Sequence, residues 1–127
     1  MKIDPRKLKR ARLVERIRAV ERSRSALAAS EAEATRRRLF GVAERTRSLA
    51  GHYARQDGAM IGTDLRGAKA MQDQLQQLCA LSEQHAEEAE LRSEATMDEL
   101  ASAERRMRRA EEDRRSLARA IVADLER

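Results

Sequence analysis

Residues 57–67 read DGAMIGTDLRG, and this stretch holds three of the five glycines in a chain of 127 residues. Between Lys7 and Asp57 the sequence has no proline and only two glycines, and from Ala68 onward it has neither. Glycine lets the backbone reverse at low steric cost, whereas long stretches without glycine or proline allow a helix to continue. The sequence therefore predicts two long helices joined at one turn.

The expected helices span about residues 5–57 and about residues 64–126, with the joint at about 58–63, and all 127 residues form a single domain. Asp4 and Pro5 make a good helix start, because Asp accepts a hydrogen bond from an orphan backbone N–H and Pro fits the first helical position. At about 1.5 Å per residue, two such helices would form a rod about 75 to 90 Å long. A rod has no enclosed cavity for chemistry, so contact with partners is the expected role.

Composition points the same way, because 39% of the residues are charged and only 2% are aromatic. Chains of this kind form coiled coils or long helices rather than compact globules. No apolar run is long enough to predict a membrane span, and the basic start lacks the apolar segment of a secretory signal. The lone Cys79 has no partner for an internal disulfide, and a reducing compartment is the simplest setting.

The second helix shows two clean heptad tracks that predict its seam, the line of residues that packs against the first helix. One track contains Leu65, Gln72, Cys79, Ala86, Ser93, Leu100, Met107, Arg114 and Ile121. The other contains Ala68, Leu75, Ser82, Ala89, Thr96, Ala103, Ala110, Leu117 and Asp124. The many alanines allow close helix approach but bury little area, so we expect modest stability.

The first helix shows a less regular pattern. Its apolar residues begin as Leu13, Ile17, Val20 and Leu27. The pattern then slips by one place and continues as Ala28, Ala32, Thr35, Leu39, Val42, Thr46, Leu49 and Tyr53. This interpretation puts all of these residues in the seam and requires a stutter, which locally unwinds a supercoil.

The charges favour an antiparallel hairpin. Residues 1–24 carry ten Lys/Arg against three acids, a net charge of +7, and residues 83–104 carry eight acids against one Arg, a net charge of −7. With the hairpin centred near Ile61, residue i would face about residue 122 − i, and the acidic block would lie beside the arginine-rich segment 18–39. In a parallel homodimer the acidic block would instead face itself. The predicted fold class is all-α, with two long helices forming an antiparallel coiled-coil hairpin.

A second apolar stripe runs along the second helix beside its seam. It follows residues 71, 74, 78, 81 and 85, rotated by about 100° from the seam. The stripe is explained either by a broad or dimerising seam or by a docking site for another protein. We predict that Leu78 and Leu81 face a partner and that Leu75 and Leu100 face the fold.

Both termini are expected to meet at a basic end, since residues 105–127 also carry a net charge of +3. This end is either a solvated face or a handle for an acidic partner surface. Nucleic acid is a weaker alternative, because glutamates interrupt the basic residues and no aromatic lies nearby to stack on bases. His52, Cys79 and His85 fit no metal pattern, and no nucleophile–base pair or phosphate loop is present, so we expect neither a metal, a cofactor nor an enzyme.

The stretch MQDQLQQLCALSEQH at residues 71–85, together with Leu49 and Tyr53, resembles the FliJ family of the flagellar type III export apparatus. The resemblance covers nearly the whole chain in length and layout, with the Tyr and the Leu and Gln-His residues carrying most of its weight. Its motifs are moderately specific. Gln74 departs from the family pattern, in which an aromatic residue is often found at that place.

The resemblance implies an antiparallel coiled coil similar to the central stalk of rotary ATPases, in the cytoplasm and peripherally associated with the inner-membrane export apparatus. It implies a hexameric export ATPase and an export-gate membrane protein as partners, and export chaperones as cargo to escort. The gate-contacting residues carried over to this chain are Leu49, Tyr53, Gln74, Leu78, Leu81 and His85. The ATPase would meet the basic open end, whose residues are Arg6, Lys7, Lys9, Arg10, Arg12 and Arg16.

Two other functions stay open on sequence grounds. The chain could be a self-associating coiled-coil scaffold with no ATPase partner. A basic nucleic-acid-associated helix pair is the more distant alternative. A virulence-type secretion system would fit the sequence as well as a flagellar one.

Overall fold

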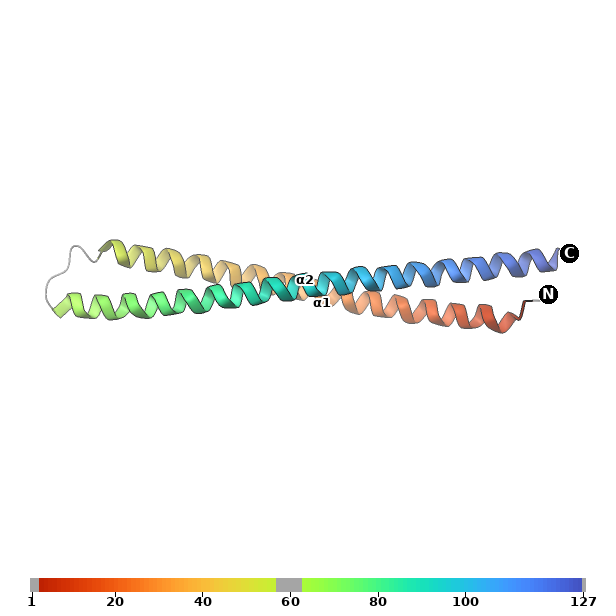
Figure 1. The fold of residues 1–127 in the computed structure, drawn as a ribbon, viewed down its shortest axis with the longest axis horizontal. Coiled ribbons are helices and arrows are strands. Elements are labelled where there is room, and N and C mark those ends of the chain that lie inside the picture. The colour runs from red at the N-terminus through yellow and green to blue at the C-terminus, as the bar shows by residue number, and fades with distance from the viewer. Residues whose placement is uncertain (1–2, 57–62, 127) are drawn as a thin grey trace. The chain divides into compact units, whose positions relative to one another are not determined.

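The computed structural model describes residues 3–56 and 63–126, which form two helices (Figure 1). Helix α1 spans Pro5–Gln56 and helix α2 spans Thr63–Leu125. The two helices pack against each other as an antiparallel hairpin, which confirms the predicted fold class. Most of the expected joint lies outside the described residues, and Thr63, which we had placed in it, is the first residue of α2.

The start of α1 is capped as predicted. The carboxylate of Asp4 accepts a hydrogen bond from the Arg6 N–H at 2.9 Å, and the Asp4 carbonyl accepts one from the Lys7 N–H at 3.0 Å. These bonds satisfy two of the donors that have no partner within a helix. The sequence Asp-Pro thus begins the helix at Pro5.

The chain divides into two compact units, each made of one part of α1 and one part of α2. Unit 1 comprises Met1–Ser30 and Ala95–Arg127, and unit 2 comprises Glu31–Glu94. Each unit has its own narrow core and its own contacts between the helices.

Unit 1 has a core of small side chains. Ala29, Thr96, Ala103 and Ala110 are buried, and Ala103 has no exposed surface at all. Hydrogen bonds join α1, and residue Ile3 just before it, to α2 in this unit. Arg114 Nε donates to Glu15 Oε2 at 2.5 Å, Arg22 Nη1 to Met107 Sδ at 3.7 Å, and the Ile3 N–H to Asp124 Oδ2 at 3.2 Å.

Unit 2 is built in the same way, with one larger residue in its core. Its buried side chains are Ala32, Ala43, Thr46, Leu75, Ser82, Ala89 and Ser93. Arg47 Nη2 donates to Glu83 Oε1 at 2.6 Å, and Ser93 Oγ donates to Glu33 Oε2 at 3.1 Å. Small residues let the two backbones approach closely, and polar bonds beside the seam hold the register.

The predicted seam of α2 is confirmed. From Ala68 to Asp124, every residue of its two heptad tracks is buried or half-buried. Only Leu65, at the start of the first track, is exposed. The regular 3.5-residue spacing of this helix was enough to identify the face that packs.

The predicted seam of α1 is wrong over its first half. Leu13, Ile17, Val20 and Leu27 are all exposed and lie on the face of α1 opposite the seam. The observed seam runs in unbroken heptads without a stutter. Its residues, all buried or half-buried except the exposed Arg22, are Leu8, Ala11, Glu15, Arg18, Arg22, Ser25, Ala29, Ala32, Arg36, Leu39, Ala43, Thr46, Ala50 and Tyr53.

The error arose because the two halves of the predicted seam lie on different faces of α1, which is one continuous helix. Of the predicted second half, Ala32, Leu39, Thr46 and Tyr53 do belong to the seam. The other four, Ala28, Thr35, Val42 and Leu49, each lie one residue before a seam residue. Steps of seven residues back from Ala32 reach Ser25, Arg18 and Ala11. These seam residues are polar or small, whereas the predicted ones were large and aliphatic. An unbroken seam needs no local unwinding, so it replaces the stutter.

The predicted register is also wrong, by one to two helical turns. A register of 122 − i would place Leu100 opposite Arg22, but Arg22 bonds to Met107. The bonds Glu15–Arg114 and Arg47–Glu83 show a similar displacement. Moving one helix by a whole heptad keeps the same residues in the seam, so the apolar pattern does not distinguish these registers. The register 122 − i would also place Val20 opposite residue 102, close to Leu100, but Val20 is exposed on the face away from α2, so these two residues are not partners.

Candidate partner-binding surfaces

The first candidate surface, here called the Leu78 surface, consists of the six residues that the sequence assigned to the export gate. Leu49, Leu78 and Leu81 are 46% to 49% exposed, and Gln74 and His85 are exposed as well. In contrast, Leu75 is only 6% exposed and Leu100 is half-buried. The prediction that Leu75 and Leu100 face the fold is therefore confirmed. Leu78 and Leu81 are exposed, and their contact with a partner stays a prediction.

The geometry of the hairpin brings α1 and α2 together in this surface. Leu49 follows the buried Thr46 by three residues, and Leu78 follows the buried Leu75 by the same interval. In an antiparallel coiled coil, residues at this interval on both helices flank the seam on one side. Leu49 and Leu78 therefore border the same side of unit 2, with Leu81 beside them.

Tyr53 differs from the other members because it belongs to the seam. It is half-buried, and its ring packs edge-on against His52, with ring centroids 5.9 Å apart and an interplanar angle of 83°. Part of the tyrosine therefore serves the fold. Only its outer part is available to a partner.

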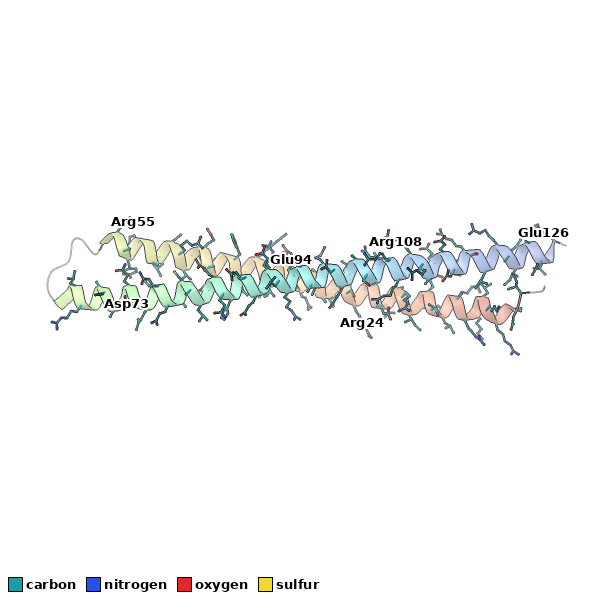
Figure 2. All side chains as sticks on the ribbon, in the orientation of Figure 1. Arg24, Arg55, Asp73, Glu94, Arg108 and Glu126 are labelled. Atoms are coloured by element: carbon teal, nitrogen blue, oxygen red, sulfur yellow. The ribbon has the colours of Figure 1, made fainter. Side chains whose placement is uncertain are left out.

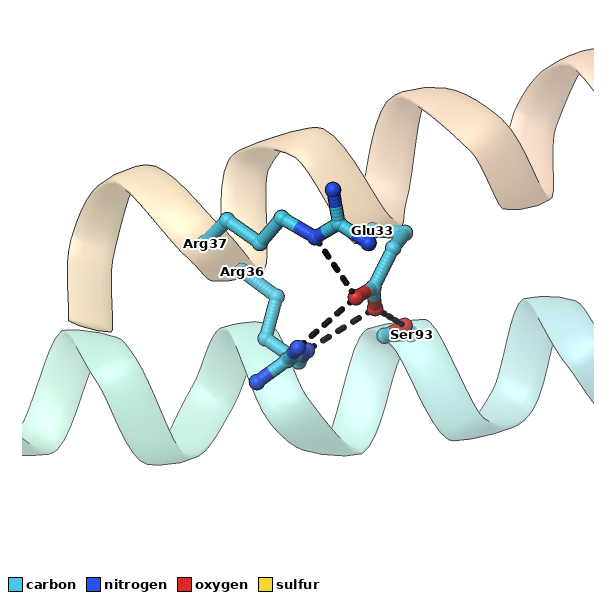
Figure 3. Close-up of polar contacts among 4 residues, drawn as sticks. All are labelled: Glu33, Arg36, Arg37 and Ser93. Atoms are coloured by element: carbon cyan, nitrogen blue, oxygen red, sulfur yellow. Dashed lines mark hydrogen bonds and ion pairs between the residues drawn. The ribbon is translucent and has the colours of Figure 1, made fainter. Parts of the chain in front are cut away.

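A network of charged residues occupies the other side of the seam in unit 2 (Figure 3). Glu33 accepts hydrogen bonds from Arg36 at 2.7 and 2.8 Å, from Arg37 at 3.2 Å and from Ser93 of α2 at 3.1 Å. The paired Arg36 bonds, together with Ser93 and Arg37, lower the pKa of Glu33 from 4.5 to about 2, although partial desolvation opposes the shift. The same hydrogen bond raises the pKa of Arg36, which stays charged.

One turn further along, a shallow groove contains the only phenylalanine of the chain. The groove has a volume of about 230 Å³ and is lined by Arg36, Phe40, Ala43, Glu44, Arg47, Glu83, Ala86, Glu87 and Glu90. Arg47 bridges Glu83 across it, and this bond raises the pKa of Arg47. Phe40 is 55% exposed beside these charges. We did not predict this groove, although an isolated aromatic next to a seam position was a signal that could have indicated it.

The basic open end belongs to unit 1. All six of its residues are exposed, as expected for a surface that meets an acidic partner. The bond between the Ile3 N–H and Asp124 joins the beginning of the described chain to the last turns of α2. The basic residues of the N-terminal turns thus lie at the same end as the C-terminal part of α2.

The structure offers little support for other kinds of site. Among residues 3–56 and 63–126, no three His, Cys, Asp or Glu side chains gather in a way that could hold a metal ion. Within the same residues, neither helix has a segment long and apolar enough to cross a membrane. Cys79 is half-buried in the seam, and His52 and His85 are exposed.

Comparison with known proteins identifies no relative. No family model, no curated protein and no solved structure matches this chain. The surfaces must therefore be interpreted from their own chemistry.

Proposed function

We propose that this protein is a non-enzymatic stalk or adaptor of a bacterial type III export apparatus, in which it links a hexameric export ATPase to the export-gate membrane protein. In this proposal the protein is cytoplasmic, lies at the inner membrane through its partners and can escort export chaperones. The function is mechanical and electrostatic, and it needs no cofactor and no nucleic acid.

The observation that carries the proposal is the exposure of Leu78 and Leu81 beside a buried Leu75. Adjacent exposed leucines that the fold does not use are typical of a protein-binding surface. Leu49 adds a third aliphatic side chain from the other helix. The same residues are those through which the resemblance implies a contact with the gate.

The basic open end supplies the second partner surface. Arg6, Lys7, Lys9, Arg10, Arg12 and Arg16 are exposed together in the first turns of α1. Among the residues that the structure describes, none of the six forms an ion pair. Uncompensated cations of this kind steer an acidic partner and set its orientation. An acidic surface of the ATPase ring would meet this requirement.

The test is a pair of variants that should lose different partners. Leu78→Ser/Leu81→Ser should abolish binding to the cytoplasmic domain of the export gate, leave binding to the ATPase intact and impair secretion or motility. Arg10→Glu/Arg16→Glu should do the reverse in the two binding assays. Leu91→Ser is the matched control, because Leu91 is also exposed on α2 but lies outside the Leu78 surface.

Two results would contradict the proposal. One is that neither variant changes binding to either partner, although both fold. The other is a stable tetramer in analytical ultracentrifugation that depends on Leu78 and Leu81, which would indicate a self-associating scaffold. Tight binding to duplex DNA at physiological salt would instead favour the nucleic-acid alternative.

A further inference from the structure

The outward face of α1 in unit 1 carries an apolar stripe that the fold does not use. Leu13, Ile17, Val20 and Leu27 are 50% to 62% exposed on the side opposite the seam. Their spacings are four, three and seven residues, which is a heptad pattern with one place taken by Arg24. These four side chains are here called the outer stripe. Their spacing is that of a helix face that packs against another helix.

The charges around the outer stripe have a single sign. Between residues 6 and 27, the other positions of this outward face hold five basic residues, one serine and no acid. These residues are Arg6, Lys9, Arg10, Arg16, Ser23 and Arg24. Figure 2 shows the labelled Arg24 on the side of α1 that points away from α2.

The acids of this segment are engaged elsewhere. Glu15 pairs with Arg114 in the seam, and Glu21 pairs with Arg18 on the flank of the helix at 2.9 Å. Within the described part of the chain, none of the five outward basic residues has an ion-pair partner. The outer stripe is therefore bordered by cations that form no ion pair with the described residues of unit 1.

We propose that residues 6–27 of α1 bind one amphipathic helix of a partner protein, with aliphatic side chains at heptad spacing and Glu or Asp residues beside them. The heptad spacing of the outer stripe matches the apolar face of a packed helix. The uncompensated cations require acidic flanks on that helix. This inference depends on α1 alone and holds whether or not the partner is an export ATPase.

A membrane surface fits these observations less well. Helices that lie in a membrane interface have a broad apolar face, commonly with aromatic residues at its border. The outer stripe is narrow, with an arginine within it, and no aromatic residue precedes Phe40 in the sequence.

A second copy of the chain is also a poor occupant. Two such faces would bring like charges together, which opposes their association. The acidic part of α2 offers the opposite charge, but from residue 84 to residue 98 its outward face contains Leu91 as its one large aliphatic side chain. That face has too few apolar side chains to fill the outer stripe.

The probe for this surface is a synthetic peptide of about three heptads with Leu at the two core positions and Glu at the flanking ones. Alone, the peptide stays unfolded because its glutamates repel one another, so a gain of helicity on mixing reports binding. Circular dichroism and the fluorescence anisotropy of a labelled peptide measure the effect with the full chain. We expect saturable one-to-one binding that weakens at least about tenfold when salt is raised from about 50 to about 500 mM.

The variant Leu13→Gln/Val20→Gln should lower the affinity at least about tenfold and leave the thermal midpoint unchanged, because both side chains are exposed. Leu91→Gln/Met97→Gln is the matched control, because both side chains are exposed on α2 outside the two proposed binding surfaces, and it should bind the peptide like the parent chain. Should the first variant unfold, Arg10→Glu/Arg24→Glu tests the same surface through charge. The Arg10→Glu/Arg24→Glu variant should no longer bind the Glu-flanked peptide and should instead bind a Lys-flanked version.

Four outcomes would overturn the proposal. The first is that the Lys-flanked or scrambled peptide binds the parent chain as tightly as the Glu-flanked one, and the second is that the Leu91/Met97 control loses binding as much as Leu13→Gln/Val20→Gln. Vesicles of about three parts phosphatidylcholine to one part phosphatidylglycerol capture the chain in a Leu13-dependent way while the peptide does not, which would identify a membrane. A dimer that disappears in Leu13→Gln/Val20→Gln would identify a second copy.

Discussion

Replacing Leu75 by alanine should destabilise the hairpin much more than replacing Leu78, three residues away on the same helix. Leu75 is 6% exposed and is the one large aliphatic side chain among the buried residues that the structure describes, whereas Leu78 is 49% exposed. Both lie in unit 2 and in a helical segment without glycine or proline, so helix propensity changes equally in the two variants. The comparison therefore isolates burial in the seam.

The expected magnitudes follow from burial. Leu→Ala removes three carbon atoms, and at about 0.8 kcal/mol per buried methylene the loss at position 75 is about 2 to 3 kcal/mol. The cavity contribution should be small, because two helices can close on each other more easily than a deep core. About half of the Leu78 side chain is already in solvent, so its replacement should cost about 1 kcal/mol or less.

Thermal melts followed by circular dichroism, with urea titrations beside them, measure both effects. At about 4 °C per kcal/mol for a chain of this size, Leu75→Ala should lower the midpoint by about 8 to 12 °C and Leu78→Ala by less than about 4 °C. Equal losses for the two variants would refute the reasoning. They would mean that the apolar stripe at Leu78 is part of a wide seam, and the assignment of the Leu78 surface to a partner would fall with it.

Three further predictions concern the seam and its charges. Ala103→Leu should lower the free energy of unfolding, measured by urea titration, by about 1 to 3 kcal/mol, because Ala103 has no exposed surface and the added carbons force the helices apart. An unchanged midpoint would contradict this and would show that the seam is loosely packed. Replacing both Glu15 and Arg114 by Leu should raise stability by about 1 kcal/mol or more, whereas Glu15→Leu alone should lower it, because it leaves an unpaired seam cation. Because the folded-state pKa of Glu33 lies near 2 and its ordinary value is 4.5, its contribution to stability is present above about pH 4.5 and is lost as the pH falls toward 2. The difference in thermal midpoint between the parent chain and Glu33→Gln should therefore shrink over this range, and a difference that stays constant from pH 7 to pH 2 would contradict the prediction.

The outward surfaces show how far periodicity alone could lead. The regular tracks of α2 separated Leu75 from Leu78 correctly, because every seventh residue along that helix keeps the same role. In α1 the same method took the outer stripe for the seam. Leu13, Ile17 and Val20 are the most hydrophobic residues at heptad spacing in that segment, and nothing local distinguishes a partner-facing stripe from a fold-facing one. The groove beside Phe40 also depends on Glu83 of the other helix and had no local pattern.

The sequence by itself determined the number of helices, their ends within one or two residues, the cap at Asp4 and the seam face of α2. These features depend on backbone propensity, capping and spacing within one segment. Only the tertiary structure decided the seam face of α1 and the register, as the bonds Glu15–Arg114 and Arg47–Glu83 show. The physical reason is that a seam is selected jointly by two helices. A shift by one heptad leaves each helix's apolar pattern unchanged, so pairing across the seam, rather than the hydrophobicity of either helix, separates one register from the next.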